Sequence, residues 1–384
     1  MGKRGKKKRL AVLGATGSIG SSTLEVVGAR GEDFEVVLLS AHSNAAALEK
    51  LGARFPGALL VLSGGADSRL SLAPGPSAAG SFRLSLAEAI AEAGADITVN
   101  GIAGAAGLAP SLDSLRAGSA LALANKETAV MAYPLVKALA AERGLPVIPV
   151  DSEHAAVFRL LEGRAGVEEI ILTASGGPFR HYSLEQLRLV KPEEALAHPT
   201  WTMGPKITVD SATMANKGLE VIEAVRLFGM KPDQVKVVIH PQSVVHSLVR
   251  TRGGALYAQL SRPDMRLPIQ EALYWPESAP SPFGALDLAG LRLDFEEPDG
   301  ERFPMLPLAY GAAGLGGLYP CAYNGANEEA VSAFFRGAVG FLDIPDIVRY
   351  VLDQDWGGAL DLESVLETDR RSREEAAARI GRYA

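Results

Sequence analysis

The sequence predicts an α/β protein that begins with a doubly wound parallel sheet and ends in helices. In the first 150 residues, short apolar runs alternate with helix-like segments, as in βαβ units. Such runs are typical of strands that are covered on both faces of a sheet. From about residue 306 onward, strand patterns stop and helical patterns take over.

The predicted elements follow in a regular order. Strands are expected at 10–13, 34–40, 58–62, 97–99, 121–124 and 147–150, and helices at 18–27, 45–55 and 86–93. Further strands are expected at 169–173, 235–239, 240–249 and 255–260, around a helix over 212–228 that stops at Gly229. The last helices are expected at 327–335, 344–353 and 371–383.

These elements divide the chain into five predicted segments. We expect a basic tail over 1–9, a Rossmann-like nucleotide-binding domain over 10–151 and a second α/β domain over 152–280. A connecting arm rich in Pro, Asp and Gly follows over 281–305, and a C-terminal α-helical domain over 306–384.

Composition and charge exclude several classes of protein. Of 384 residues, 47% are hydrophobic and 22% charged, a globular balance. With 38 basic and 45 acidic residues, the net charge is −7, so we expect no nucleic-acid partner. The single Cys321 excludes an intrachain disulfide and a cysteine-cluster metal site. The uncharged stretch 303–327 is interrupted by Pro and Gly, so we expect no membrane span there. No long apolar run follows the basic tail, so we expect no signal peptide. We therefore expect a cytoplasmic location.

The first glycine-rich loop predicts a nucleotide site. Gly14-Ala-Thr-Gly17-Ser-Ile-Gly20 lies between the first strand and the first helix. Glycines let backbone N–H groups approach a pyrophosphate closely at the positive end of a helix. The spacing GxxGxxG is less common than GxGxxG, and a tight structural turn is the alternative interpretation.

The end of the second strand indicates which cofactor binds. Enzymes that use NAD place an acidic residue there to hold the ribose 2′-hydroxyl. This chain has Ser40-Ala-His42-Ser43-Asn44 instead, which favours the 2′-phosphate of NADP. No Arg or Lys is adjacent, so His42, Ser43 and Asn44 would have to hold that phosphate.

Three acidic residues form a candidate metal site. Asp151 and Glu153 follow the strand at 147–150, and Glu220 lies on the predicted helix 212–228. Three carboxylates without Cys or His suit a hard cation such as Mg²⁺ or Mn²⁺. Taken alone, Asp151 and Glu153 are more typical of a solvated turn than of a metal site.

Residues near the start of that helix suit a phosphate. Asn216 lies four residues before Glu220 and shares its face. Ser211 is expected near the helix N-terminus, and Lys217 is expected to reach a phosphate as a point charge. The small residues Ser175-Gly-Gly177 follow a strand and suggest a second phosphate turn. A plain helix cap and an exposed lysine are the alternatives for Ser211 and Lys217.

The segment from His198 to Lys206 resembles a lid. It places Trp201 and Met203 between Pro and Gly residues, so apolar tips would exclude water. A tryptophan that fills the core is the alternative. His240 and His246 are expected on one strand face, either as a hydrogen-bonded pair or as a metal site.

Together these motifs resemble the 1-deoxy-D-xylulose 5-phosphate reductoisomerase family. The motifs occur in one order: 14–20, Ala124-Asn-Lys-Glu127, Val150-Asp-Ser-Glu-His154, Thr173-Ala-Ser-Gly-Gly-Pro-Phe179, 198–206, Val209–Glu220 and His240–His246. The likeness continues through Asp264-Met-Arg-Leu-Pro and Asn324-Gly-Ala-Asn327-Glu. One departure is Ser43, where many members carry a basic residue.

The resemblance implies a function and a set of site residues. The reaction is rearrangement and reduction of 1-deoxy-D-xylulose 5-phosphate to 2-C-methyl-D-erythritol 4-phosphate, in non-mevalonate isoprenoid biosynthesis. The cofactors are NADPH and Mg²⁺ or Mn²⁺, with Co²⁺ as a further candidate. The implied metal ligands are Asp151, Glu153 and Glu220. The implied NADPH contacts are Thr16, Gly17, Ser18, Ile19, Asn44, Asn125, Glu127 and Gly204.

The implied substrate contacts are Lys126, Ser152, Glu153, Ser175, His198, Ser211, Asn216, Lys217 and Glu220, and the implied catalytic set is Lys126, Glu153, His198, Trp201 and Met203. The resemblance also implies a homodimer, with catalysis, metal binding and dimerisation in 152–280. Two rival interpretations are a metal-free NADP dehydrogenase of the aspartate-semialdehyde or homoserine type and a non-catalytic NADP-binding regulator. Neither has a use for the three carboxylates together.

Overall fold

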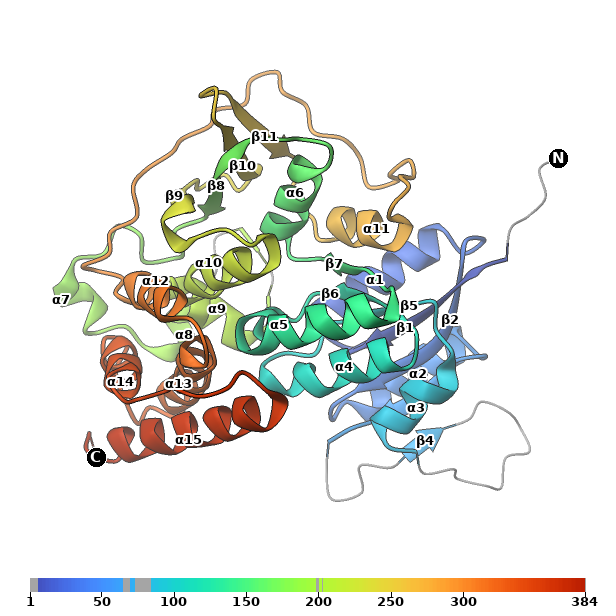
Figure 1. Ribbon diagram of the computed structural model, residues 1–384, viewed down its shortest axis with the longest axis horizontal. Coiled ribbons are helices and arrows are strands. Elements are labelled where there is room, and N and C mark those ends of the chain that lie inside the picture. The colour runs from blue at the N-terminus through green and yellow to red at the C-terminus, as the bar shows by residue number, and fades with distance from the viewer. Residues whose placement is uncertain (1–5, 65–69, 73–83, 198–199, 202, 384) are drawn as a thin grey trace. The chain divides into compact units, whose positions relative to one another are not determined.

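The computed structural model describes residues 6–64, 70–72, 84–197, 200–201 and 203–383 (Figure 1). The chain forms two compact units, each built from separate stretches of sequence. The first contains Met1–Asn125, Val136–Asp151 and Asp264–Gly284. The second contains Lys126–Leu135, Ser152–Pro263 and Ala285–Ala384.

The first unit is organised around a sheet with strand order β4-β3-β2-β1-β5-β6-β7. The strands are β1 (Lys8–Leu13), β2 (Phe34–Ala41), β3 (Leu59–Leu62), β4 (Leu70–Leu72), β5 (Ile97–Asn100), β6 (Ala120–Leu123) and β7 (Val147–Pro149). All neighbouring pairs are parallel except β3 and β4. The doubly wound parallel sheet predicted from the sequence is confirmed, and the short antiparallel β4 is an addition to it.

Helices follow the strands of this unit in alternation. They are α1 (Ser18–Ala29), α2 (Ala45–Arg54), α3 (Leu86–Ala93), the 3-10 turn η1 (Ala105–Gly107) and α4 (Leu108–Arg116). The sequence marks the bounds of α3, because Ser85 and Glu88 form a capping box and Gly94 ends the helix in the left-handed conformation. Helix α5 (Lys126–Arg143) runs from the second unit into the first, with a non-helical Ala132 two residues before Pro134.

A late segment of the chain completes the first unit. Helix α11 (Arg266–Tyr274) packs against α1, where Arg266 forms an ion pair with Glu25 at 2.9 Å. The Tyr274 ring meets Phe34 edge-on at 5.2 Å. The linear division predicted from the sequence places 264–280 with the second domain, whereas its contacts group it with the first unit.

The second unit contains a smaller sheet with strand order β11-β10-β8-β9. The strands are β8 (Val167–Ala174), β9 (Val235–Ile239), β10 (Val245–Thr251) and β11 (Leu256–Leu260). Helices α6 (Ser152–Leu161) and α10 (Ala215–Phe228) pack against this sheet and against each other. The remaining short helices of this part are α7 (Leu184–Leu187), α8 (Pro192–Ala195), α9 (Pro205–Ala212) and the 3-10 turn η2 (Pro232–Gln234).

The end of the chain is helical, as predicted. After an arm with no helix or strand, α12 (Met305–Leu315), α13 (Tyr319–Phe335), α14 (Asp343–Leu352) and α15 (Leu362–Ile380) follow one another. Helix α13 lies at the centre of this group, with contacts to α12, α14 and α15, and it also contacts α9 and α10. None of the helices in the described ranges is long and apolar enough to cross a membrane.

Two sequence-based expectations about the second unit are wrong. The helix predicted over 212–228 begins only at Ala215, because Met214 takes a positive φ of 64° between α9 and α10. The strand predicted over 240–249 begins only at Val245, and His240 lies in the preceding turn.

Candidate active site

The glycine-rich loop lies between β1 and β5, where the strand order of the first sheet reverses. Gly14 has a φ of +75°, and a Cβ there would lie 2.7 Å from the Gly101 carbonyl oxygen, after β5. A Cβ at Gly20 would lie 2.4 Å from the Gly14 oxygen. Both positions therefore require glycine. Gly17 precedes α1 with no side-chain cap, so the helix start offers backbone N–H groups, as a dinucleotide phosphate requires.

The other predicted NADPH contacts of the first unit lie on its loops and in the first turn of α1. Thr16 and Ile19 are half-buried, and Ser18 is exposed at the start of α1. Asn44 caps α2, where its Oδ1 accepts from the Ala47 N–H at 3.1 Å. His42 and Ser43 are exposed beside it, and no carboxylate follows β2. The buried Asn125 donates its amide to the carbonyls of Ile102 and Gly104 at 2.7 and 2.9 Å.

The predicted metal ligands lie together. One carboxylate oxygen from each of Asp151, Glu153 and Glu220 lies within 4.8 Å of the others. Asp151 immediately precedes α6, which carries Glu153, and α10 supplies Glu220. Glu220 is 1% exposed, a degree of burial that a carboxylate tolerates only when other groups compensate its charge. This donor set of oxygens alone fits a hard divalent cation.

Two buried lysines contact these carboxylates. Lys126 Nζ lies 3.1 Å from Glu220 Oε1 and 2.5 Å from Asn216 Oδ1. Lys217 Nζ lies 2.7 Å from Glu153 Oε1 and also contacts Glu220 Oε2. Burial lowers the pKa of Lys217, but the carboxylates of Glu153 and Glu220 outweigh it and raise that pKa above its ordinary value. Both ammonium groups are thus held on the carboxylate cluster.

Helix α10 presents its polar residues as the sequence predicts. Asn216 Nδ2 donates to Glu220 Oε1 at 2.6 Å, so the two residues share one face. Lys217 is 3% exposed, which excludes the alternative of an ordinary surface lysine. Ser211 lies in the last turn of α9 instead of at the start of α10, and its carbonyl accepts from the N–H of Met214, which directly precedes α10.

His154 is a residue of this site that sequence reasoning did not single out. Its ring is fully buried, with Nε2 3.0 Å from the Glu220 carbonyl oxygen and Nδ1 3.3 Å from Glu223 Oε2. Asp151, His154 and Glu223 form a second group close enough to hold a metal. The signal in the sequence was its position next to Glu153, within the segment Asp151–His154.

The small-residue turn after β8 lies beside Ser211. Gly176 and Gly177 have φ values of 85° and 68°, and a Cβ at Gly177 would lie 2.8 Å from the Ser211 carbonyl oxygen. Ser152, at the start of α6, donates from its Oγ to Glu153 Oε2 at 2.5 Å. The turn that carries Ser175 and the end of α9 thus lie side by side, as a shared phosphate site requires.

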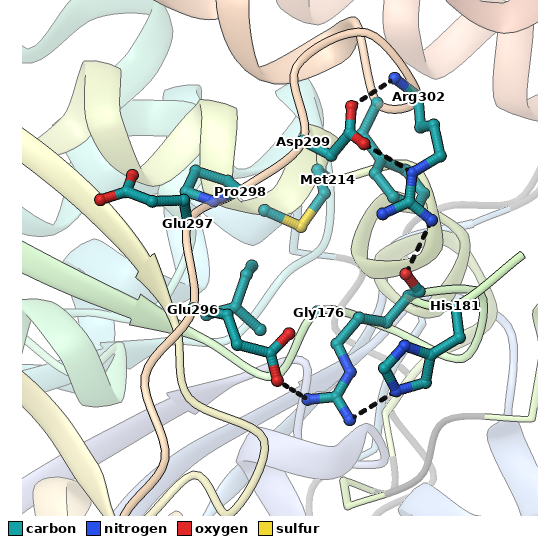
Figure 2. Close-up of a pocket in the computed structure, with 11 residues that line it drawn as sticks. Gly176, His181, Met214, Glu296, Glu297, Pro298, Asp299 and Arg302 are labelled. Atoms are coloured by element: carbon teal, nitrogen blue, oxygen red, sulfur yellow. Dashed lines mark hydrogen bonds and ion pairs between the residues drawn. The ribbon is translucent and has the colours of Figure 1, made fainter.

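Gly176 also lines a small pocket of about 70 Å³ (Figure 2). Its charged residues contact one another: Arg180 lies 3.4 Å from Glu296, and Arg302 lies 2.7 Å from Asp299. Met214 also lines it. None of the predicted metal ligands lines this pocket.

The described part of the predicted lid contacts a histidine. The Trp201 and His246 rings lie 6.4 Å apart, and Trp201 and Met203 are half-buried. His198 lies outside the described residues. Burial lowers the pKa of His246 to about 4, so the ring that faces Trp201 is neutral. Gly204 precedes α9 and is exposed.

The two histidines predicted on one strand face are separated. His246 lies on β10, with Nε2 2.9 Å from Ser261 Oγ. His240 lies in the turn before it, where Nδ1 donates to the Asp294 carbonyl and Nε2 accepts from the Val244 N–H. Neither belongs to the groups of described residues that could hold a metal.

Comparison with known proteins identifies the family. Family models match three stretches: 1-deoxy-D-xylulose 5-phosphate reductoisomerase over residues 10–133, its C-terminal domain over 147–228, and the DXP reductoisomerase C-terminal domain over 260–375. A curated relative from Treponema denticola, named 1-deoxy-D-xylulose 5-phosphate reductoisomerase, is 45% identical over 97% of both chains. A relative of the same name from Pelodictyon phaeoclathratiforme is 47% identical over 96% of this chain and 98% of its own.

Solved structures agree with these relatives. The reductoisomerase from Zymomonas mobilis in complex with NADPH is 41% identical, with a TM-score of 0.85 over 98% of this chain and 99% of its own. A DOX-P reductoisomerase in complex with NADPH, fosmidomycin and magnesium is 37% identical, with a TM-score of 0.87 over 97% and 98% of the two chains. The chain therefore belongs to the 1-deoxy-D-xylulose 5-phosphate reductoisomerase family.

Proposed function

We propose that the carboxylates of Asp151, Glu153 and Glu220 form the cation site at which this chain performs its family's reaction. That reaction is the NADPH- and divalent-cation-dependent rearrangement and reduction of 1-deoxy-D-xylulose 5-phosphate to 2-C-methyl-D-erythritol 4-phosphate. The observation that carries the proposal is the approach of the three carboxylates to within 4.8 Å. The direct test is to supply the sugar phosphate, NADPH and Mg²⁺, follow the nicotinamide absorbance, and identify the product by mass spectrometry.

The carboxylates and lysines have complementary roles in this proposal. When bound, the cation polarises the substrate carbonyl and a neighbouring hydroxyl, and NADPH supplies the hydride. Lys126 reaches the same carboxylates from α5 and is our candidate for proton handling at the substrate oxygens. Glu153 and Glu220 hold Lys217 protonated, which keeps its positive charge for the substrate phosphate.

The remaining residues bind the substrate or exclude water. We assign the phosphate to Ser175, Ser211, Asn216 and Lys217, with further substrate contacts from Ser152 and His198. The proximity of the Gly177 turn to Ser211 supports this assignment. Trp201 and Met203 are assigned to a cover that keeps water from the reacting substrate.

We assign NADPH binding to the residues that the resemblance implies, which are Thr16, Gly17, Ser18, Ile19, Asn44, Asn125, Glu127 and Gly204. The glycines that cannot carry a Cβ and the uncapped start of α1 support a pyrophosphate at this loop.

We predict a preference for NADPH over NADH of at least about tenfold in kcat/KM, because no carboxylate follows β2 to hold a ribose hydroxyl. Ser43→Asp should reduce this ratio by repelling the 2′-phosphate, whereas Ser43→Ala should change it little. Initial rates with both nucleotides measure the effect. Equal kcat/KM values in the unmodified chain would contradict the assignment.

We also propose that the protein is a homodimer that pairs through the second unit. Strand β11 is an edge strand, and its Leu256 and Tyr257 side chains are 48% and 42% exposed. The connecting arm of the same unit exposes Leu288 and Phe295 at 67% and 47%. Exposed edges and apolar side chains are features that a partner chain covers.

The buried thiol of Cys321, which needs no disulfide partner, supports a cytoplasmic location.

Leu256→Lys is expected to shift the protein from dimer to monomer, since a lysine on an edge strand opposes pairing with another chain. Sedimentation velocity at several concentrations measures the change. Leu189→Lys, at a side chain that is 78% exposed elsewhere in the unit, serves as the control and should leave the dimer intact. A monomeric unmodified protein would overturn the proposal.

A further inference from the structure

A chain of buried polar contacts in the second unit joins three helices. Lys206, near the start of α9, places its Nζ 2.8 Å from Glu127 Oε1 on α5 and 2.9 Å from Asp210 Oδ2. The other oxygen of Asp210, Oδ1, accepts from Asn327 Nδ2 on α13 at 2.9 Å. We call these four side chains the Lys206 relay.

Three of the four side chains of the relay are buried and depend on their neighbours, and the fourth, Lys206, is 24% exposed. Glu127 is 6% exposed, Asp210 1% and Asn327 0%. Burial raises the pKa of Glu127, but Lys206 outweighs this effect and lowers it below its ordinary value. In turn, Asp210 and Glu127 raise the pKa of Lys206 despite its burial. The Lys206 ammonium thus compensates the carboxylates of both Glu127 and Asp210. The Asn327 amide donates to the second carboxylate oxygen of Asp210.

Two members of the relay, Glu127 and Lys206, adjoin residues of the proposed active site in sequence. Glu127 directly follows Lys126, whose Nζ contacts Glu220. Lys206 comes two residues after Gly204, at the end of the segment that carries Trp201 and Met203. Helix α13 makes a second contact with α5 where Asn324 Nδ2 lies 3.6 Å from Met131 Sδ.

We propose that Lys206 and Asn327 are positioning residues for the reaction. Through Asp210 and Glu127, helix α13 fixes the start of α9 and the first turn of α5, and thereby holds both Lys126 and the covering segment in register. The inference rests on the site assignments made above. It gives the C-terminal helices a part in turnover, although no member of the relay touches the three carboxylates in the contacts described.

Asn327→Asp tests the relay by placing a carboxylate against Asp210. We expect kcat to fall about tenfold or more, as for other residues that orient catalytic groups. Asp210→Asn combined with Asn327→Asp removes the repulsion between two carboxylates and restores the hydrogen bond between positions 210 and 327. In this double variant the amide at position 210 donates to the carboxylate at position 327, and its oxygen faces Lys206 in place of a carboxylate. The double variant should therefore recover part of the lost kcat.

The control adds the same charge elsewhere on α13. Ser332→Asp lies beside Arg336, which already contacts the Ser332 hydroxyl at 2.6 Å, and should leave kcat unchanged. Thermal melting of each variant separates turnover from folding. Loss of kcat without a matching loss of melting temperature, together with recovery in the double variant, supports the relay.

Two results would overturn it. One is wild-type kcat in Asn327→Asp, and the other is a double variant that melts like the unmodified protein yet fails to recover turnover. The unmodified protein is assayed alongside, so failure of the relay is distinguished from failure of the proposed function. If the unmodified chain reduces the sugar phosphate and Asn327→Asp does so equally well, only the relay is wrong.

Discussion

Glu220→Gln is expected to lower kcat by about three orders of magnitude while NADPH still binds, because the change removes one of the three proposed cation ligands and its negative charge. Glu220 also contacts Lys126, Lys217 and Asn216, so its loss leaves two buried ammonium groups under-compensated. Steady-state rates at saturating sugar phosphate and Mg²⁺ measure kcat, and quenching of NADPH fluorescence measures binding of the cofactor.

The matched control for this variant is Glu168→Gln. Glu168 lies on β8 in the same unit but is exposed, so the same chemical change should leave kcat within about twofold, as surface substitutions generally do. If Glu220→Gln kept more than a tenth of the unmodified kcat, Glu220 would not be an essential ligand. Parallel losses of turnover and of NADPH affinity would also contradict its assigned role.

Removal of divalent cations should abolish turnover, and adding back Mg²⁺ or Mn²⁺ should restore it. Three carboxylates that share one site repel one another, and a divalent ion relieves this repulsion while it polarises the substrate. The experiment treats the protein with a chelator, removes the complex by gel filtration and measures rates over a series of cation concentrations.

The same treatment separates this chain from a metal-free NADP dehydrogenase. Such an enzyme would keep its full rate after chelation, which would contradict the cation assignment. NADPH binding provides the internal control, since its assigned residues in the first unit include none of the three carboxylates. A protein that lost NADPH binding on chelation would point to general unfolding.

The parts of the site that the sequence predicts well are those set by local geometry. Gly14 and Gly20 are required by close backbone contacts within one strand–turn–helix unit, and glycine spacing reports such contacts directly. Asn216 and Glu220 share a face because a helix repeats every 3.6 residues. The proximity of Glu220 to Glu153, in contrast, depends on tertiary structure, and it is predicted by family resemblance as well as by the chemistry of three carboxylates.

The errors lie where tertiary packing overrides a local pattern. Residues 212–228 have helical periodicity throughout, yet Met214 adopts a left-handed conformation that non-glycine residues rarely take. His240 continues an apolar strand pattern, but the carbonyl of Asp294, distant in sequence, holds its ring in a turn. The burial of Lys217 could not be predicted either, because its compensating partner Glu153 lies on a different helix.

The return of Asp264–Gly284 to the first unit bears on how this protein is made. Lys8 in β1 donates to the carbonyl of Leu273 at 2.7 Å, and Asp33, just before β2, contacts Tyr274. The first two strands therefore depend on contacts with residues that are synthesised much later. Domains commonly fold during translation as soon as their sequence is complete. Here the first unit is complete in sequence only when the ribosome has synthesised the chain as far as Gly284. A fragment truncated at residue 151 would lack α11, the helix that packs against α1.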